Sequence, residues 1–285
     1  MSMHLLHTVH YILQNPTWAF ARAGTWLRPP TWLRALLGAA MPPWRGTSRF
    51  RSVYVVTYGR SGSTLLTGYL THLPGFDIKG ENYLFPLPLA DAEERLAAAA
   101  RLPYQGRSKP ASPWYGSHEF STLQWKRDVR RALLNQLYPF RPIPKTIGFK
   151  EIRWWYRTTE EDFEQKLRWI TSIRKPGAII FLTRNLDDTM AGAWWVKLSD
   201  EERVRQRAAL EDFERRAAAY AHANPDHAIH VTYEAFCADS REAQRLCAML
   251  GVRFREDVYR QTLGERYSYP SNPQGGANGG TTASA

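Results

Sequence analysis

The sequence predicts an α/β domain with a mainly parallel sheet that helices flank on both faces. Short runs of β-branched and aromatic residues alternate with longer stretches of helical spacing, which is the pattern of repeated βαβ units. The chain has 285 residues, of which 44% are apolar and 23% are charged, enough for a sizeable core. This balance excludes a chain that is disordered throughout.

Four segments have the composition of buried strands: Ser52–Tyr58, Thr146–Glu151, Ala178–Thr183 and Ala228–Tyr233. Each of them is short and contains β-branched or aromatic residues and no proline. Nearly continuous apolar runs, rather than strict alternation, are typical of strands that are covered on both faces. We therefore expect these four strands to form a parallel sheet.

Stretches of helical spacing lie between and after these strands: Leu65–Leu73, Ala90–Arg101, Glu119–Leu137, Thr159–Ser172, Ser199–Ala223 and Asp239–Leu250. The clearest helix begins at Ser199, because Glu202 follows at the spacing of a capping box. Thr159 and Asp162 are placed to act at the start of another helix. Gly251 is the expected left-handed C-terminal cap of the last one.

The chain is predicted to have three regions: a helical segment over 1–48, the α/β domain over 49–264, and a disordered tail over 265–285. Before Asp77 the chain holds seven arginines and no acidic residue, so this part carries +7 of the net charge of +11. Residues 1–48 also hold four tryptophans. Such a basic, Trp-rich segment suits peripheral contact with an anionic membrane, whereas we do not expect nucleic acid as a partner. The alternative is a pair of short helices packed on the domain.

Two cysteines, Cys237 and Cys247, are too few for a disulfide framework or a structural zinc site. No run of eighteen apolar residues occurs, so the sequence predicts no membrane-spanning helix. We expect a cytoplasmic protein without a bound metal, because no clustered metal ligands are apparent.

The most informative stretch joins the first strand to the first helix through Gly59-Arg60-Ser61-Gly62-Ser63-Thr64. The two glycines allow a tight turn, and the loop N–H groups and helix N-terminus then point at one anion site. Arg60 adds a positive charge, while the serines and Thr64 add hydroxyl donors. The loop is P-loop-type but not a Walker A motif, because Ser63 stands where that motif has lysine. The alternative is a purely structural turn.

This loop resembles the 5′-phosphosulfate loop of the sulfotransferases that use 3′-phosphoadenosine 5′-phosphosulfate (PAPS), in particular their bacterial and carbohydrate branches. The resemblance continues through Gly80-Glu81, Gly148–Glu151, Phe181–Asn185 and Val231–Glu234, and covers about Val53 to Val252. It implies that Arg60, Ser61, Gly62, Ser63 and Thr64 bind the 5′-phosphosulfate of PAPS.

The resemblance also implies that Arg184 binds the 3′-phosphate of PAPS. One departure concerns that phosphate: many members have a serine eight residues after this arginine, where this chain has Gly192. Thr189 is the nearest hydroxyl, but it would face elsewhere on a helix. Arg184 would then hold the 3′-phosphate alone or with backbone help.

For the general base, the resemblance to carbohydrate-active members points to Glu81, and the alternative is a solvated surface glutamate. His72 is the second candidate, since an unshifted histidine titrates near working pH. Lys150 either binds sulfuryl oxygens or forms a salt bridge. The aromatic residues after Arg153 and after Arg184 either stack on an acceptor or pack in the core.

The sequence therefore predicts a sulfotransferase that moves a sulfuryl group from PAPS to a hydroxyl, of a carbohydrate or glycolipid acceptor, by in-line transfer without a metal. A monoanionic sulfuryl group needs less neutralisation than a phosphoryl group, so Arg60 and the loop N–H groups would suffice. The alternatives are a nucleotide-dependent kinase and a non-catalytic protein that binds a membrane or nucleic acid.

Overall fold

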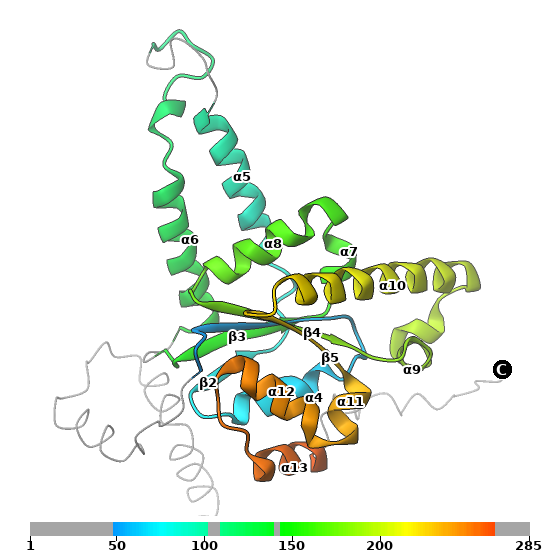
Figure 1. Cartoon of the computed structure of the whole chain (residues 1–285). Helices are drawn as coiled ribbons and strands as arrows, with labels where there is room; N and C mark the ends of the chain where they lie inside the picture. Colours follow the sequence, from blue (N-terminus) through cyan, green and yellow to red (C-terminus); the bar gives the residue numbers. More distant parts are fainter. Residues whose placement is uncertain (1–47, 102–108, 140–142, 266–285) are drawn as a thin grey trace, which may run out of the picture.

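The computed structural model describes residues 48–101, 109–139 and 143–265, and in these ranges it contains one five-stranded parallel sheet (Figure 1). The strands are β1 (Ser52–Val56), β2 (Phe76–Lys79), β3 (Thr146–Glu151), β4 (Gly177–Thr183) and β5 (Ala228–Thr232). Their order in the sheet is β2-β3-β1-β4-β5, and every neighbouring pair is parallel. The predicted α/β class is thus confirmed.

Strand β1 lies at the centre of the sheet and is hydrogen-bonded on both sides. Val53 is in register with Gly148 of β3 and with Ala178 of β4. All five residues of β1 are buried. Because parallel strands end at the same edge of a sheet, the segments that follow β1, β3 and β4 meet there.

Helices cover both faces of this sheet, as Figure 1 shows. One face carries α5 (Leu87–Arg101), α6 (Thr122–Leu137), α7 (Trp154–Arg157), α8 (Glu160–Ser172) and α10 (Asp200–Ala223). The other carries α4 (Ser63–His72), α11 (Tyr233–Ala238), α12 (Ser240–Leu250) and α13 (Glu256–Gly264). Alternate residues of each central strand point to opposite faces, so Tyr54 packs in the first core and Val53 in the second.

The helix ends follow the expected local chemistry. Ser199 forms the full capping box with Glu202 at the start of α10, and the Thr159 side chain accepts from the Asp162 N–H at the start of α8. Gly251 has φ of 71°, the left-handed conformation that ends α12.

Other elements depart from the sequence prediction. Strand β2 was not predicted, because its four residues include Asp77 and Lys79 and half of them are only partly buried. The predicted helix from Glu119 is shorter, since Ser121 caps α6 and a 3-10 turn, η1 (Ser117–Glu119), precedes it.

Several short elements were also not predicted. They are α7, α9 (Leu186–Met190), η2 (Ala193–Lys197), α11 and the longer α13. The helical segment predicted over 1–48 lies almost wholly, and the tail predicted over 265–285 wholly but for its first residue, outside the described residues. Within the described ranges, no helix is long and apolar enough to cross a membrane.

Candidate functional site

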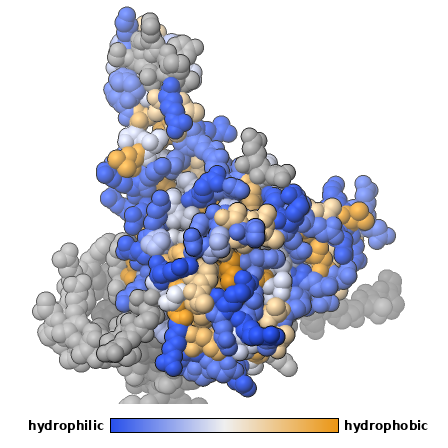
Figure 2. Space-filling view, viewed as in Figure 1, coloured by the Kyte–Doolittle hydropathy of each residue, from blue (hydrophilic) through white to orange (hydrophobic). Residues whose placement is uncertain are grey.

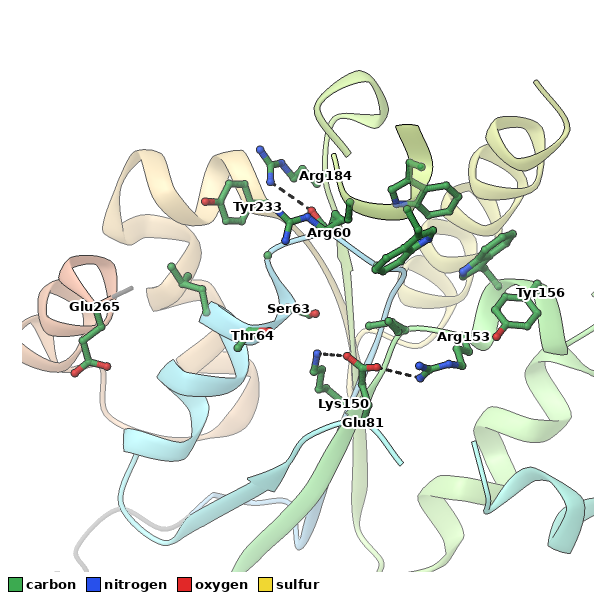
Figure 3. Close-up of a pocket in the computed structure, with 18 of the residues that line it drawn as sticks. Arg60, Ser63, Thr64, Glu81, Lys150, Arg153, Tyr156, Arg184, Tyr233 and Glu265 are labelled. Carbon is green, nitrogen blue, oxygen red and sulfur yellow. Dashed lines mark hydrogen bonds and ion pairs between the residues drawn. The ribbon is translucent and has the colours of Figure 1, made fainter. Parts of the chain in front are cut away.

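A cavity of about 940 Å³ opens at the edge of the sheet where the parallel strands end. Its lining comes from the loop after β1, the start of α4, the segments after β2, β3 and β4, the start of α11, and the end of α13. Figure 3 shows two groups in this cavity: Arg60, Arg184 and Tyr233 lie together, and Glu81 lies between Lys150 and Arg153. The start of α4, with Ser63 and Thr64, lies between the groups.

The first group is built on the loop that joins β1 to α4. Gly62 is the N-cap residue of α4, its φ is 83°, and no side chain caps the helix. The first N–H groups of α4 therefore have no capping side chain and remain free to bind an anion, which the helix dipole also attracts. A Cβ at Gly62 would lie 2.1 Å from Cδ2 of Tyr233, so only glycine fits beneath that ring.

The base of this loop is fixed by buried hydroxyl groups. Oγ1 of Thr57 lies 2.7 Å from Oγ of Ser61 and 2.6 Å from the carbonyl oxygen of Leu182 in β4. Since Thr57 has one hydroxyl proton, it donates to the carbonyl and accepts from Ser61. Ser61 is fully buried and does not line the cavity, whereas Ser63 and Thr64 do. The Ser61 side chain thus supports the loop rather than facing a ligand.

Arg184, which follows β4, is held by its backbone and by its side chain. The Tyr58 hydroxyl accepts from the Arg184 N–H at 2.8 Å and lies 2.7 Å from the Arg184 carbonyl oxygen. The Arg184 guanidinium lies 4.7 Å from the centre of the Tyr233 ring, and its Nη1 donates to the Arg60 carbonyl at 3.3 Å. Its Nε is buried and has no hydrogen-bond partner among the described residues.

Tyr58 itself contacts Glu214 of α10 through a hydrogen bond between its hydroxyl and the carboxylate. Burial raises the pKa of Glu214, although the Tyr58 hydroxyl lowers it. Burial, followed by the hydrogen bond to Glu214, raises the pKa of Tyr58, so the phenol keeps its proton in the working pH range. A neutral phenol has one proton. The Tyr58 hydroxyl can therefore accept from the Arg184 N–H while it donates to the Glu214 carboxylate. Tyr58 therefore links the strand of the loop to Arg184.

The second group consists of Glu81 and two basic residues. One Glu81 oxygen lies 2.7 Å from Nζ of Lys150, and the other lies 3.0 Å from Nη1 of Arg153. The same Arg153 nitrogen also contacts Glu151 at 2.9 Å. Burial raises the pKa of Glu81, but the hydrogen bonds and charges of Lys150 and Arg153 outweigh burial and lower it. Glu81 is thus an ionised carboxylate at neutral pH, and Lys150 is in the salt bridge considered above.

The cavity brings together most of the predicted site residues but not all of them. Arg60, Gly62, Ser63, Thr64, Glu81 and Arg184 line it. His72, the second candidate for the base, lies in the last turn of α4, where it is exposed and its Nδ1 is 2.8 Å from the Gly68 carbonyl. It does not line the cavity, so a role for it in catalysis has no support in the geometry.

Of the aromatic residues after Arg153 and Arg184, some pack in the core and others line the cavity, where an acceptor could stack. Trp154 is buried in the core, whereas Trp155, Tyr156, Trp194 and Trp195 line the cavity. Tyr156 and Trp194 are the exposed members, and Trp194 stands against the loop. A Cβ at Gly59 would lie 2.3 Å from the Trp194 ring. This side of the cavity is therefore a partly exposed aromatic wall.

Gly192, the departure noted in the sequence, lies beside the loop. Its φ of −137° and ψ of 170° are extended, so any residue can adopt them. A Cβ there would meet only Nε of Arg60 within 4 Å, at 3.9 Å. Thr189 is buried, and its hydroxyl lacks a partner among the described residues and does not line the cavity.

The sequence contains no local signal for two contributions that the structure makes plain. In the sequence, Tyr58 and Tyr233 each look like the last residue of a strand. In the structure, Tyr58 positions Arg184, whereas Tyr233 covers Gly62 and stacks on the Arg184 guanidinium. In the described ranges, no three His, Cys, Asp or Glu side chains gather where they could hold a metal ion.

A sequence model described as the sulfotransferase family matches residues 52–256, from the start of β1 to the start of α13. No curated protein sequence matches significantly. Among solved structures, the sulfotransferase domain of the olefin synthase from Synechococcus PCC 7002 is similar, with 18% sequence identity and a TM-score of 0.46. That match covers 76% of this chain and 78% of the other.

Proposed function

Since the chain belongs to the sulfotransferase family, we propose that it transfers a sulfuryl group from PAPS to an acceptor hydroxyl. The observation that carries this proposal is the uncapped start of α4 at Gly62, which faces the same cavity as Arg60 and Arg184. A polyanionic donor needs such convergent N–H groups and fixed positive charges.

The residues of the first group fit the two ends of the donor. The N–H groups at the start of α4, with the hydroxyls of Ser63 and Thr64 and the charge of Arg60, suit the 5′-phosphosulfate. Arg184 suits the 3′-phosphate, because its buried Nε has no partner among the described residues and can donate to an anion. When bound, PAPS supplies the sulfuryl group and leaves as 3′-phosphoadenosine 5′-phosphate.

The residues of the second group suit the acceptor. The Glu81 carboxylate takes the proton of the acceptor hydroxyl as the new oxygen–sulfur bond forms and the bond to the 5′-phosphate breaks. Lys150 lies between Glu81 and the loop in Figure 3, where its charge can stabilise the transferring oxygens. As Lys150 turns to those oxygens, Glu81 loses one of the groups that lower its pKa and becomes a stronger base.

A carbohydrate or glycolipid acceptor is supported by the aromatic wall. Tyr156 and Trp194 are exposed and line the cavity. The face of a sugar ring packs well on such a flat side chain, while the polar groups of the second group can bind its hydroxyls. The acceptor would then lie between the aromatic wall and Glu81.

Calorimetric titration tests the donor site. We expect the product 3′-phosphoadenosine 5′-phosphate to bind more tightly than ATP with magnesium, and Arg184→Ala and Arg60→Ala each to weaken its binding by about tenfold or more. Arg205→Ala, an exposed arginine of α10 outside the cavity, is the matched control and should leave binding unchanged. Preference for ATP with magnesium would identify a kinase instead. Binding of neither nucleotide would overturn the proposed donor.

A further inference from the structure

Helices α5 and α6 form a hairpin that projects away from the sheet (Figure 1). Its base is anchored: Leu87 of α5 and Leu133 of α6 belong to the core cluster, and the buried Lys166 of α8 pairs with Asp91 of α5. Farther out, the hairpin stands clear of the body (Figure 2). The far end therefore has no role in covering the sheet.

Large apolar side chains gather at the far end of this hairpin. Trp114, Tyr115, Phe120 and Leu123, which we call the tip cluster, are between 39% and 59% exposed. They lie within ten consecutive residues that lead into α6 through the turn η1. Several large exposed apolar side chains within a short segment are typical of a contact surface.

The acids of α5 are engaged in ion pairs, whereas most basic residues of the hairpin form no ion pair with the described residues. Asp91 and Glu94 pair with Lys166, and Glu93 pairs with Lys126 and accepts from Trp169. Of the remaining acids, Asp128 accepts from Gln124 and Glu119 lies 3.8 Å from His118. By contrast, six basic residues of the hairpin form no ion pair with the residues that the structure describes: Arg95, Arg101, Lys109, Arg127, Arg130 and Arg131. All six are exposed.

The unpaired arginines of α6 lie directly behind the tip cluster. Leu123, Arg127, Arg130 and Arg131 are spaced by four, seven and eight residues from the first, so they share one face of the helix. A neighbouring face, with Val129 and Leu133, is buried against the body. One stripe of α6 therefore leads from an exposed leucine to a row of free positive charges.

We propose that the hairpin tip is a docking surface for an anionic lipid bilayer. Trp, Tyr and Phe are the residues that settle at the boundary between headgroups and acyl chains, and Leu can enter the acyl region. The arginines behind them reach the anionic headgroups, and each contributes roughly a factor of five in affinity. Nucleic acid would match the charges but not the exposed leucine and phenylalanine. The proposal stands apart from the proposed sulfuryl transfer, because it concerns a surface away from the cavity.

Co-sedimentation of the full chain with vesicles tests the proposal. We expect binding to vesicles with about a quarter phosphatidylglycerol in phosphatidylcholine, and little to phosphatidylcholine alone. The variant Arg127→Gln/Arg130→Gln/Arg131→Gln should bind about a hundredfold more weakly. Its control, Arg205→Gln/Arg253→Gln/Arg260→Gln, removes the same charge from other exposed positions and should bind as the wild type does.

A second pair of variants tests insertion of the tip cluster. Tyr115→Ser/Phe120→Ser/Leu123→Ser should lower vesicle binding by about tenfold or more, because less apolar surface leaves water. Val204→Ser, at an exposed apolar position of α10, should leave binding unchanged. These positions are exposed, so we expect the variants to fold, and titration with 3′-phosphoadenosine 5′-phosphate reports this independently.

Amide hydrogen exchange with and without vesicles locates the contact. Protection of residues 109–131 supports the proposal. Protection confined to residues 1–47, unchanged binding of both hairpin variants, or an equal loss in both control variants would each overturn it. Tight binding of duplex DNA that the tip-cluster variant retains in full would overturn it in favour of nucleic acid.

Discussion

The two sides of the cavity are held in place by different kinds of interaction. On the loop side, backbone groups form the key contacts: Gly62 starts a helix without a side-chain cap, and the Tyr58 hydroxyl accepts from the Arg184 N–H. On the other side, long side chains hold one another, with Glu81 shared between Lys150 and Arg153. Backbone geometry is rigid, whereas paired side chains can exchange partners. The first side thus suits a constant donor, and the second suits a group that must change its contacts during the reaction.

The largest expected effect is the fall in kcat on removal of the Glu81 carboxylate. This variant distinguishes the two sides of the cavity, because it should change turnover but not nucleotide binding. Glu81→Gln keeps the shape but cannot take a proton, so we expect kcat to fall about a hundredfold to ten-thousandfold. Calorimetric titration should show that 3′-phosphoadenosine 5′-phosphate binds as before, because Glu81 is not on the loop side. If turnover survives, Glu81 is not the base.

The pH profile of the same reaction checks the partners of Glu81. Because Lys150 and Arg153 lower its pKa below the usual 4.5, the carboxylate stays ionised to lower pH, and activity is lost only as pH falls through that lowered value. In Arg153→Gln one lowering contact is gone, so the acid limb should move to higher pH. An acid limb that stays in place would contradict this coupling.

A smaller effect is expected from Tyr58→Phe, which tests whether a backbone contact sets the donor site. Loss of the hydroxyl leaves the Arg184 N–H without its partner, so we expect binding of 3′-phosphoadenosine 5′-phosphate to weaken about tenfold while the KM of the acceptor is unchanged. The matched control is Tyr138→Phe, a buried tyrosine whose hydroxyl accepts from the Gly148 N–H at 2.8 Å, away from the cavity. Equal loss of donor affinity in both variants would mean a general loss of stability.

The smallest expected effect is a gain in affinity for the nucleotide. Gly192→Ser places a hydroxyl beside Arg60, in a backbone conformation that serine adopts without strain. We expect the nucleotide to bind roughly fivefold more tightly, the worth of about one hydrogen bond. Gly192→Ala is the control for the added Cβ. If the alanine and serine variants bind alike, the hydroxyl does not reach the nucleotide.

The sequence predicts the loop side better than the acceptor side, for a physical reason. Arg60 to Thr64 are consecutive, so one strand–loop–helix pattern places them all. The partners of Glu81 come from β3 and the segment after it, about seventy residues away, and meet it only because β3 lies between β2 and β1. Tyr58 reaches Arg184 because β1 lies next to β4. Strand order is a non-local property that composition and periodicity do not contain.

The same reasoning applies to the elements of the fold. Strands with continuous apolar runs and helices with capping residues were predicted, because their signals are local. Strand β2 has only Phe76 and Ile78 buried, and its partner lies far along the chain. The two serines of the loop differ in a way that the sequence does not reveal. The Ser61 side chain points inward and contacts Thr57, while Ser63 lines the cavity.

The central position of β1 has a consequence for how the molecule opens. Its amides are shared between two neighbouring strands and all its residues are buried, so they exchange with solvent only when the whole domain unfolds. The outer part of the α5–α6 hairpin packs on little and opens at far lower cost. Motion of the outer α5–α6 hairpin therefore does not disturb β1, the strand from which the loop starts. The hairpin can thus move while the loop at the cavity keeps its shape.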